Sequence, residues 1–234
     1  ESLNCNFKES VKPIEKLEKQ NSSITPVLRR LKMLPKILNT ENIISKPPEK
    51  VEYSWASQSA IQVGTVVHEL LHRITIDGIK NWSPKRIIEN SSEFEFKLRM
   101  LGVHKPHLDQ SVNRVKQALV KIMEDSTGLW ILQEHNESSS EHIINFLHNN
   151  VLQQLRIDRT FIDEHGTRWI IDYKTSSHEG GSKDEFLESE LNRYKGQLEL
   201  YAKAYSKMDN TNIKVGLYFP LLQAFQSWTP EIHH

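Results

Sequence analysis

The spacing of hydrophobic and polar positions changes near residue 128. Between Ser54 and Glu124 apolar residues recur at helical spacing, as in the run Val63, Val66, Val67, Leu70, Leu71 and Ile74. Ser83 followed by Pro84 predicts the start of another helix, and Leu108–Met123 is a second amphipathic stretch. This pattern predicts a helical part over residues 55–127.

Short segments typical of strands follow residue 128. The pattern predicts strands at Trp130–Gln133, His142–Leu147, Leu152–Ile162, Arg168–Tyr173, Ile213–Phe219 and Ala224–Trp228. Asp163–Gly166 supplies turn residues for a hairpin. One long helix interrupts the strands, because apolar residues step along one face at Leu187, Leu191, Tyr194, Leu198, Tyr201 and Tyr205. We therefore expect an α/β fold with a sheet core over residues 128–234, in which helices flank a small mixed β-sheet.

Composition narrows the possible functions. The 30 basic and 30 acidic residues cancel, so the chain is no globally basic nucleic-acid binder, although a local basic groove is compatible with this balance. Cys5 is the single cysteine, which excludes a disulfide scaffold and a four-cysteine zinc site. The sequence has no phosphate-binding GxxxxGK[ST] loop and no apolar run long enough for a membrane span.

Residues 1–54 differ in character from the rest. This segment carries a basic stretch at Arg29, Arg30, Lys32 and Lys36, and it contains the Pro47-Pro48 pair, which is typical of a linker. The first residue is Glu1 rather than Met. We therefore interpret residues 1–54 as a basic lead-in from an upstream region and residues 55–234 as the functional domain.

One short motif suggests a zinc protease. His68-Glu69-Leu70-Leu71-His72 matches HExxH on a helix, where both imidazoles can bind one zinc ion and Glu69 can act as general base. The extended form of this motif fails, because Thr75 replaces its Gly and Gly78 replaces its third His. Glu89 and Glu93 lie downstream at a usable distance for a third ligand, but neither of them is part of a recognisable motif.

A second set of residues suggests metal-dependent hydrolysis. Asp158 lies on one strand of the predicted hairpin, and Asp172 and Lys174 lie at the end of the next. Asp172 and Lys174 are two residues apart, so they point to the same face of a strand. Paired carboxylates suit Mg²⁺ or Mn²⁺, and a neighbouring lysine suits a reaction in which negative charge develops.

Four motifs in order strengthen this second hypothesis. They are Gly64-Thr65-Val66-Val67-His68, Arg156-Ile157-Asp158, Ile171-Asp172-Tyr173-Lys174-Thr175, and Tyr194-Lys195-Gly196-Gln197-Leu198-Glu199-Leu200-Tyr201. Together they resemble the RecB-like branch of the PD-(D/E)XK nucleases, in the form found at the C-terminus of UvrD/Rep-type helicase–nucleases of the AddA and RecB kind. One departure is Leu155, which stands where the family often has a Gly. The resemblance implies a restriction-endonuclease-like core.

The resemblance also implies roles for individual residues. Catalytic roles fall to Asp158, Asp172 and Lys174. Metal ligands are His68, Asp158, Asp172 and the backbone carbonyl of Tyr173, and Mg²⁺ or Mn²⁺ is the expected cofactor. The family usually adds a Glu on the strand before the hairpin, for which Glu134 is the candidate and Glu137 the alternative. DNA contacts or support of the site are expected from Gln197, Tyr201, Tyr194, Arg156 and Arg159.

Partners and setting follow from the same resemblance. It implies a sequence-independent DNA nuclease, exonucleolytic in action, that serves double-strand break repair and recombination. The expected partners are linear DNA, whose single strand a helicase motor feeds, the ATP-dependent helicase region of the same polypeptide upstream, and a second, AddB-like subunit. We expect no membrane association and a cytoplasmic, nucleoid-associated location in a bacterium. A DNA-end-binding scaffold without catalysis is the alternative from another functional class.

Overall fold

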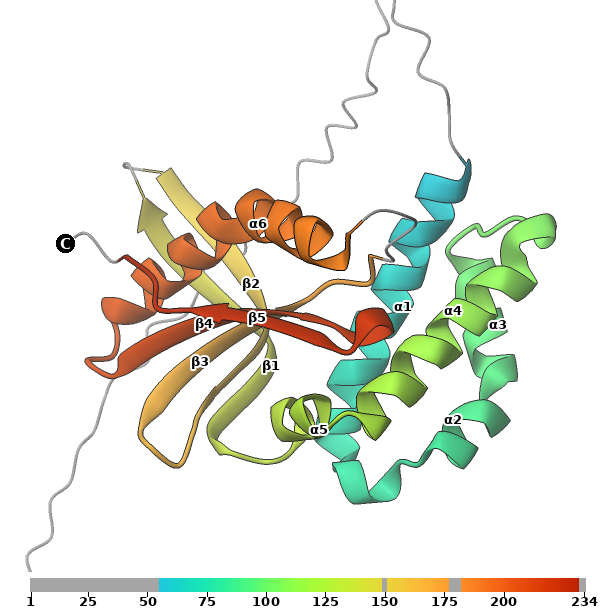
Figure 1. Ribbon diagram of the computed structural model, residues 1–234, viewed down its shortest axis with the longest axis horizontal. Helices are drawn as coiled ribbons and strands as arrows, with labels where there is room; N and C mark the ends of the chain where they lie inside the picture. The colour runs from blue at the N-terminus through green and yellow to red at the C-terminus, as the bar shows by residue number, and fades with distance from the viewer. Residues whose placement is uncertain (1–54, 149–150, 177–181, 232–234) are drawn as a thin grey trace, which may run out of the picture. The chain divides into compact units, whose positions relative to one another are not determined.

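Five strands form one mixed sheet in the order β1-β2-β3-β4-β5 in the computed structural model (Figure 1). The strands are β1 (Asn136–His148), β2 (Val151–Ile162), β3 (Thr167–Tyr173), β4 (Asn212–Phe219) and β5 (Ala224–Trp228). Only β3 and β4 pair in parallel, and the other neighbours are antiparallel. The structure describes residues 55–231 except 149–150 and 177–181, and the predicted lead-in over residues 1–54 lies outside them.

Helices lie on both faces of this sheet. The helical part before it comprises α1 (Trp55–Asp77), η1 (Ile79–Asn81), α2 (Pro84–Glu89), α3 (Ser91–Met100), α4 (Lys105–Glu124) and α5 (Ser126–Leu132). The connection from β3 to β4 contains α6 (Lys183–Ser206), and η2 (Pro220–Leu222) precedes β5. No described helix is long and apolar enough to cross a membrane.

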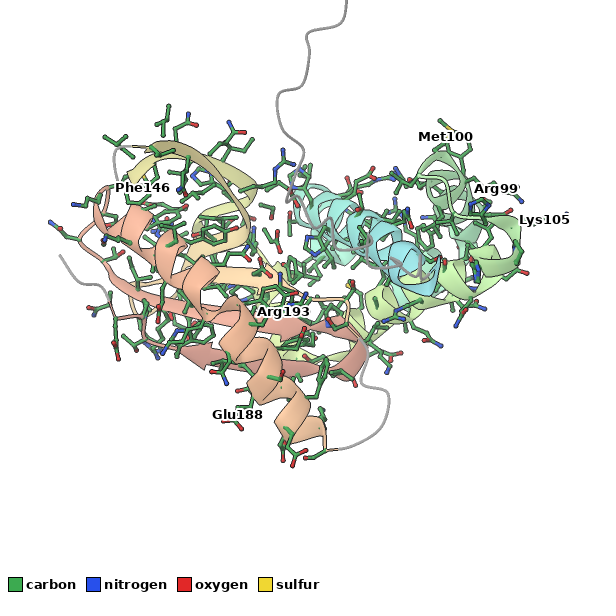
Figure 2. All side chains as sticks on the ribbon, turned by 90° about the horizontal axis from the view of Figure 1, so that it is seen from above. Arg99, Met100, Lys105, Phe146, Glu188 and Arg193 are labelled. Carbon is green, nitrogen blue, oxygen red and sulfur yellow. The ribbon has the colours of Figure 1, made fainter. Side chains whose placement is uncertain are left out.

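Two hydrophobic cores hold these layers together. One joins the helices α1–α5 to one face of the sheet through Phe161, Trp169, Ile171 and Tyr218. The other joins the opposite face to α6 through side chains that include Ile157, Ile170, Leu198 and Tyr205. Figure 2 shows the layers from above, with Phe146 at the β1–β2 hairpin and Arg99 on the helical part. Each face of β3 is therefore covered, as expected for the buried centre of an α/β sheet.

Most predicted elements are confirmed. The hairpin of β2 and β3, the helix α6, and the strands β4 and β5 lie where the sequence pattern places them. The side chain of Ser83 accepts a hydrogen bond from the Arg86 N–H and caps α2, which confirms that predicted helix start. The α/β fold with a mixed sheet flanked by helices is confirmed.

The predicted strand at Trp130–Gln133 is wrong, because this segment belongs mainly to α5. Asp125 caps the helix by accepting a hydrogen bond from the Gly128 N–H, and the same carboxylate accepts one from the Tyr218 hydroxyl. A Cβ at Gly128 would lie 2.7 Å from that hydroxyl, so glycine allows the close approach of α5 to β4. The helical part therefore continues to Leu132 instead of ending at residue 127.

Candidate functional site

A polar cluster lies where α1 faces the interior of β2 and the end of β3. His68 comes from the middle of α1, and its Nδ1 lies 3.3 Å from Asp158 Oδ1. Its Nε2 lies 3.0 Å from the carbonyl oxygen of Tyr173. The Tyr173 N–H donates a hydrogen bond to the other oxygen of Asp158 at 2.8 Å. Asp158 is therefore held by both the helix and the neighbouring strand.

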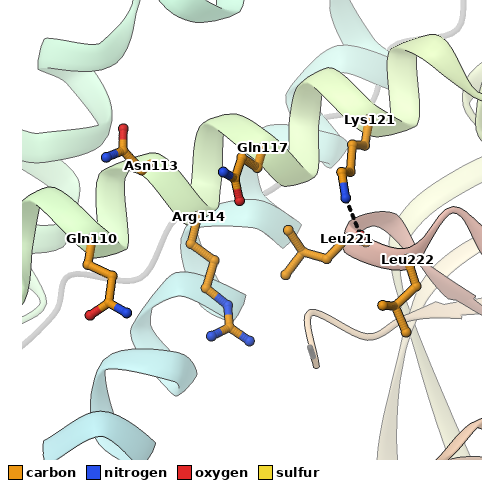
Figure 3. A pocket seen from close by; sticks show the side chains of 7 residues that line it. All are labelled: Gln110, Asn113, Arg114, Gln117, Lys121, Leu221 and Leu222. Carbon is orange, nitrogen blue, oxygen red and sulfur yellow. Dashed lines mark hydrogen bonds between the residues drawn. The ribbon is translucent and has the colours of Figure 1, made fainter. Parts of the chain in front are cut away.

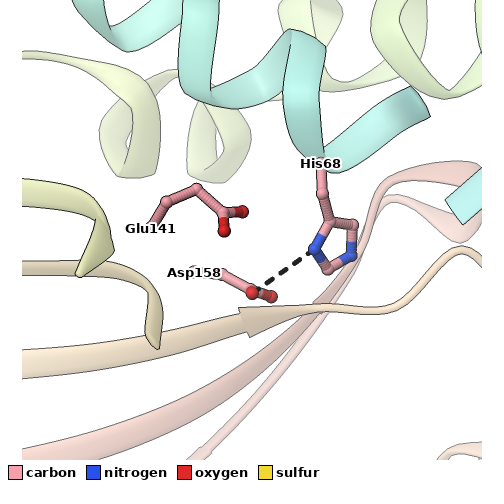
Figure 4. Close-up of side chains that lie close together, drawn as sticks. All are labelled: His68, Glu141 and Asp158. Atoms are coloured by element: carbon pink, nitrogen blue, oxygen red, sulfur yellow. Dashed lines mark ion pairs between the residues drawn. The ribbon is translucent and has the colours of Figure 1, made fainter. Parts of the chain in front are cut away.

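Glu141 on β1 completes this cluster (Figure 4). His68, Glu141 and Asp158 each offer a ligand atom, and these atoms all lie within 4.8 Å of one another. The backbone of Glu141 has a positive φ of 53°, which is uncommon for a residue other than glycine. Such strained positions occur often at functional sites, because the surrounding structure holds them there.

The backbone of β2 is irregular beside this cluster. Ile157 belongs to the core against α6, whereas Arg159 and Phe161 face the helices α1–α5. In a regular strand these three residues would all face one side. The alternation therefore shifts at Asp158, which points its carboxylate toward α1 and His68.

Asp172 and Lys174 form a second group on the α6 side of the sheet. The Lys174 ammonium lies 2.7 Å from Asp172 Oδ2 and 3.7 Å from the ring centroid of Tyr194. The Gln197 amide donates hydrogen bonds to Asp172 Oδ1 at 3.3 Å and to the Tyr201 hydroxyl at 2.6 Å. Asp172 is 4% exposed, so its carboxylate depends on these partners.

The two groups are linked electrostatically. Burial raises the pKa of Asp172 to about 6, the negative charge of Asp158 adds to the rise, and Lys174 opposes it. Burial disfavours the charged form of His68, but the hydrogen bond and charge of Asp158, with Asp172 and Glu141, raise its pKa above the ordinary value. The carboxylates of Glu141, Asp158 and Asp172 thus act on the protonation of one another and of His68.

This group of carboxylates suits a divalent cation. Two carboxylates and an imidazole converge from three different elements, and the Tyr173 carbonyl oxygen lies beside the same imidazole. An open groove of about 610 Å³ reaches the cluster and is lined by Ile61, Gly64, Thr65, His68, Glu69, His72, Glu141, Arg156 and Asp158. The residues present therefore fit a metal ion that a ligand can approach from solvent.

The glutamate expected before the hairpin is a different residue from those predicted. Glu134 is exposed and lines another hollow near η1, and Glu137 is exposed and pairs with Arg168. Glu141 instead joins His68 and Asp158. The prediction for Glu134, and the alternative Glu137, is therefore corrected to Glu141.

The arginines expected at DNA differ from each other. Arg156 has a side chain that is 64% exposed, lines the groove and pairs with Glu141 at 3.3 Å. Arg159 is 3% exposed, and its guanidinium donates hydrogen bonds to the carbonyls of Ile131 and Gln133 and to the Ser140 hydroxyl. The structure thus contradicts a DNA contact by Arg159, because its guanidinium ties α5 to the sheet.

The helix residues predicted near the site occupy several environments. Gln197 and Tyr194 reach Asp172 and Lys174 respectively. Tyr201 has both a packing role and a role near the site. Its ring belongs to the core between α6 and the sheet, and its hydroxyl accepts a hydrogen bond from Gln197.

The HExxH residues do not form a zinc site in the described part of the chain. Glu69 pairs with Lys97 at 2.5 Å, and the one cluster of possible metal ligands there contains His68 without His72. His68 instead faces Asp158 and Tyr173. The zinc-protease hypothesis therefore gains no support from the geometry.

Comparison with known proteins agrees with this arrangement. The profile of the PD-(D/E)XK nuclease superfamily matches residues 44–226. No curated protein matches the chain. A solved structure described as the crystal structure of SSO0001 is 13% identical over 72% of this chain and 80% of that chain, with a TM-score of 0.30, a similarity too distant to support an assignment. By the superfamily match, which covers most of its length, the chain belongs to the PD-(D/E)XK nuclease superfamily.

Proposed function

We propose that this chain is a metal-dependent deoxyribonuclease that cleaves DNA strands without regard to sequence. The observation that carries the proposal is the Asp172–Lys174 pair beside the cluster of His68, Glu141 and Asp158. Superfamily membership supports nuclease chemistry in general. The order of the four sequence motifs supports the finer, RecB-like assignment.

The proposed metal is Mg²⁺ or Mn²⁺, held by His68, Glu141 and Asp158, with Asp172 and the Tyr173 carbonyl beside them. When bound, such an ion polarises the scissile phosphate and lowers the pKa of a water molecule. An imidazole is a better ligand for Mn²⁺ than for Mg²⁺, so activity with both ions is expected.

Residues of the chain position the attacking water, stabilise negative charge and contact the substrate. Lys174 is held by Asp172 and by the ring of Tyr194, so its ammonium is oriented before a substrate arrives. From there it can position the attacking water and stabilise the negative charge that develops on the phosphate. Gln197 and Tyr201 hold Asp172 from the other side. Arg156 is exposed in the groove and suits a phosphate contact.

The setting that we propose is a helicase–nuclease that processes DNA ends for repair and recombination. Residues 1–54 would connect the nuclease to an upstream motor of the same polypeptide, and a second, AddB-like subunit is the proposed partner. The motor would feed single-stranded DNA to the site for exonucleolytic cleavage. Because the proposed substrate is DNA, the location that we propose is nucleoid-associated, in the bacterial cytoplasm.

Cleavage of end-labelled linear single-stranded DNA tests the proposal. We expect cleavage with Mg²⁺ or Mn²⁺, loss of cleavage in EDTA, and loss in Lys174→Ala. A protein that binds the strand but does not cut it with either ion, even as part of its full-length chain, would instead be a scaffold module.

A further inference from the structure

A second groove, about 670 Å³ in volume, lies along α4 (Figure 3). We call it the α4 groove, and its lining residues are Gln110, Asn113, Arg114, Gln117, Lys121, Leu221 and Leu222. Gln110, Asn113, Gln117 and Lys121 follow one another at steps of three, four and four residues, with Arg114 next to Asn113, so the five polar residues form one stripe of the helix. The candidate metal site does not use any of them.

The stripe is separate from the face that α4 buries. Leu108, Val112, Val115, Leu119 and Ile122 of α4 belong to the core, whereas Gln110, Asn113 and Gln117 are exposed. The lining contains two cations, three carboxamides and no carboxylate. Such a surface has donors for an anion and nothing that repels one.

One further lysine, Lys183, adds to this charge at the wall formed by η2. Lys121 Nζ donates to the Leu221 carbonyl at 2.7 Å, and Lys183 Nζ donates to the Leu222 carbonyl at 3.1 Å. Within the described residues neither lysine forms an ion pair with a carboxylate. An ammonium has three donors, so each can also contact a bound anion.

The α4 groove is connected to the candidate metal site through Thr175. Arg114 Nη2 donates to the Thr175 carbonyl at 3.1 Å. Thr175 directly follows Lys174, and a Cβ on Gly64 would lie only 3.1 Å from its hydroxyl oxygen. Gly64 lines the groove at the metal cluster. Thr175 therefore contacts the lining of both grooves.

We propose that the α4 groove binds the sugar-phosphate backbone of the strand that is cleaved, at nucleotides away from the scissile bond. The identity of this strand rests on the function proposed above. Ammonium, guanidinium and amide groups position a phosphate backbone without selecting a base sequence. The groove thereby extends the contact with single-stranded DNA beyond the metal site and holds the strand in place for cleavage.

Binding of a long fluorescent single strand, measured by anisotropy in Ca²⁺ across a salt series, tests this proposal. Lys121→Gln removes one phosphate contact, so the slope of log K against log salt should fall by about 1. Gln117→Glu keeps the shape of an exposed side chain but adds a negative charge, so affinity should fall roughly tenfold. Matched controls are Lys207→Gln and Asn210→Asp, which change exposed residues at the α6–β4 turn and should behave as wild type.

The length of the strand separates this groove from the metal site. Gln117→Glu should affect a long strand more than an oligonucleotide too short to leave the metal site. Unchanged affinity and salt slope in both α4 variants would overturn the α4 groove while leaving the nuclease proposal intact. A wild-type protein that binds the strand through the α4 groove but cleaves nothing would instead overturn the nuclease proposal alone, and a protein that binds no strand would overturn both.

Discussion

Glu141 and Asp158 occupy facing positions on β1 and β2. The pairs Ser140–Arg159 and His142–Ile157 flank them in register, so the two carboxylates are opposite each other across the hairpin. Like charges placed in this way destabilise a sheet. The arrangement becomes favourable when a cation lies between them, and His68 on α1 supplies the third donor.

The first prediction concerns the choice of glutamate. Glu141→Gln should weaken Mn²⁺ binding roughly 10–100-fold, because it removes one charged donor from the cluster. Glu134→Gln is the matched control and should leave binding unchanged, since Glu134 is exposed and outside the cluster. Calorimetric titration with Mn²⁺ measures the affinity of the two variants. Equal affinity in both would remove Glu141 from the metal site.

The position of Glu141 shows what sequence reasoning lacks. The residue types for a metal site are visible in the sequence, and so is the hairpin that carries Asp158 and Asp172. Which glutamate joins them depends on the register of β1 with β2. This register follows from the His148–Val151 pair beside the hairpin turn, from which successive residues of β1 are paired in turn with those of β2. A shift of one residue would turn the side chain to the other face. Counting register from this hairpin could have found Glu141.

The predictions of a DNA contact by Arg159 and of a strand in place of α5 are wrong for a related reason. A basic residue beside Asp158 is visible in the sequence, but its burial against the Ile131 and Gln133 carbonyls is a property of the packed fold. The apolar run at Leu129–Leu132 is short enough to suit a helix or a strand, and contacts far along the chain, such as Asp125 with Tyr218, favour the helix. Long elements with a clear period, such as α6, could be predicted.

The second prediction separates stability from activity at Asp172. Its pKa is raised from the model-compound value of 3.8 to about 6, so the folded state favours the protonated form. The corresponding stability is present below pH 3.8 and is lost as pH rises through about 6. In EDTA above that pH, Asp172→Asn should therefore stabilise the protein, by on the order of 2 kcal/mol, while abolishing cleavage.

Urea denaturation of wild type and Asp172→Asn at several pH values measures this effect. The difference between the two proteins should be largest at alkaline pH and should shrink as the pH falls toward 3.8. If the variant is less stable than wild type at every pH, the buried charge of Asp172 does not destabilise the folded protein and the prediction is wrong.

The third prediction is that metal binding strengthens as pH rises. The pKa of His68 is raised by Asp158 and the pKa of Asp172 is raised to about 6 by burial, so both hold protons at acid pH that a cation must displace. Mn²⁺ affinity should increase as pH rises through about 6, and binding should release protons. Calorimetry in buffers of different ionisation enthalpy measures this release. Affinity that stays constant between about pH 5 and 8 would contradict it.

The fourth prediction concerns Lys174. Lys174→Gln should reduce cleavage at least about 100-fold, because the charge beside the developing negative charge is lost. The same change removes the cation that lowers the pKa of Asp172, so any remaining activity should shift to higher pH. Mn²⁺ should still bind at high pH. Loss of cleavage without a shift in the pH profile would argue against the coupling between these two residues.

The last prediction compares two arginines on the same strand. Arg156→Gln alters an exposed side chain in the groove, so it should weaken single-stranded DNA binding and reduce its salt dependence while leaving stability nearly unchanged. Arg159→Met should instead destabilise the fold by roughly 2–4 kcal/mol, because the buried carbonyl of Ile131 and the part-buried carbonyl of Gln133 lose their donor. Urea denaturation and anisotropy on both variants separate the two roles. Normal stability in Arg159→Met together with weakened DNA binding would restore Arg159 as a DNA contact.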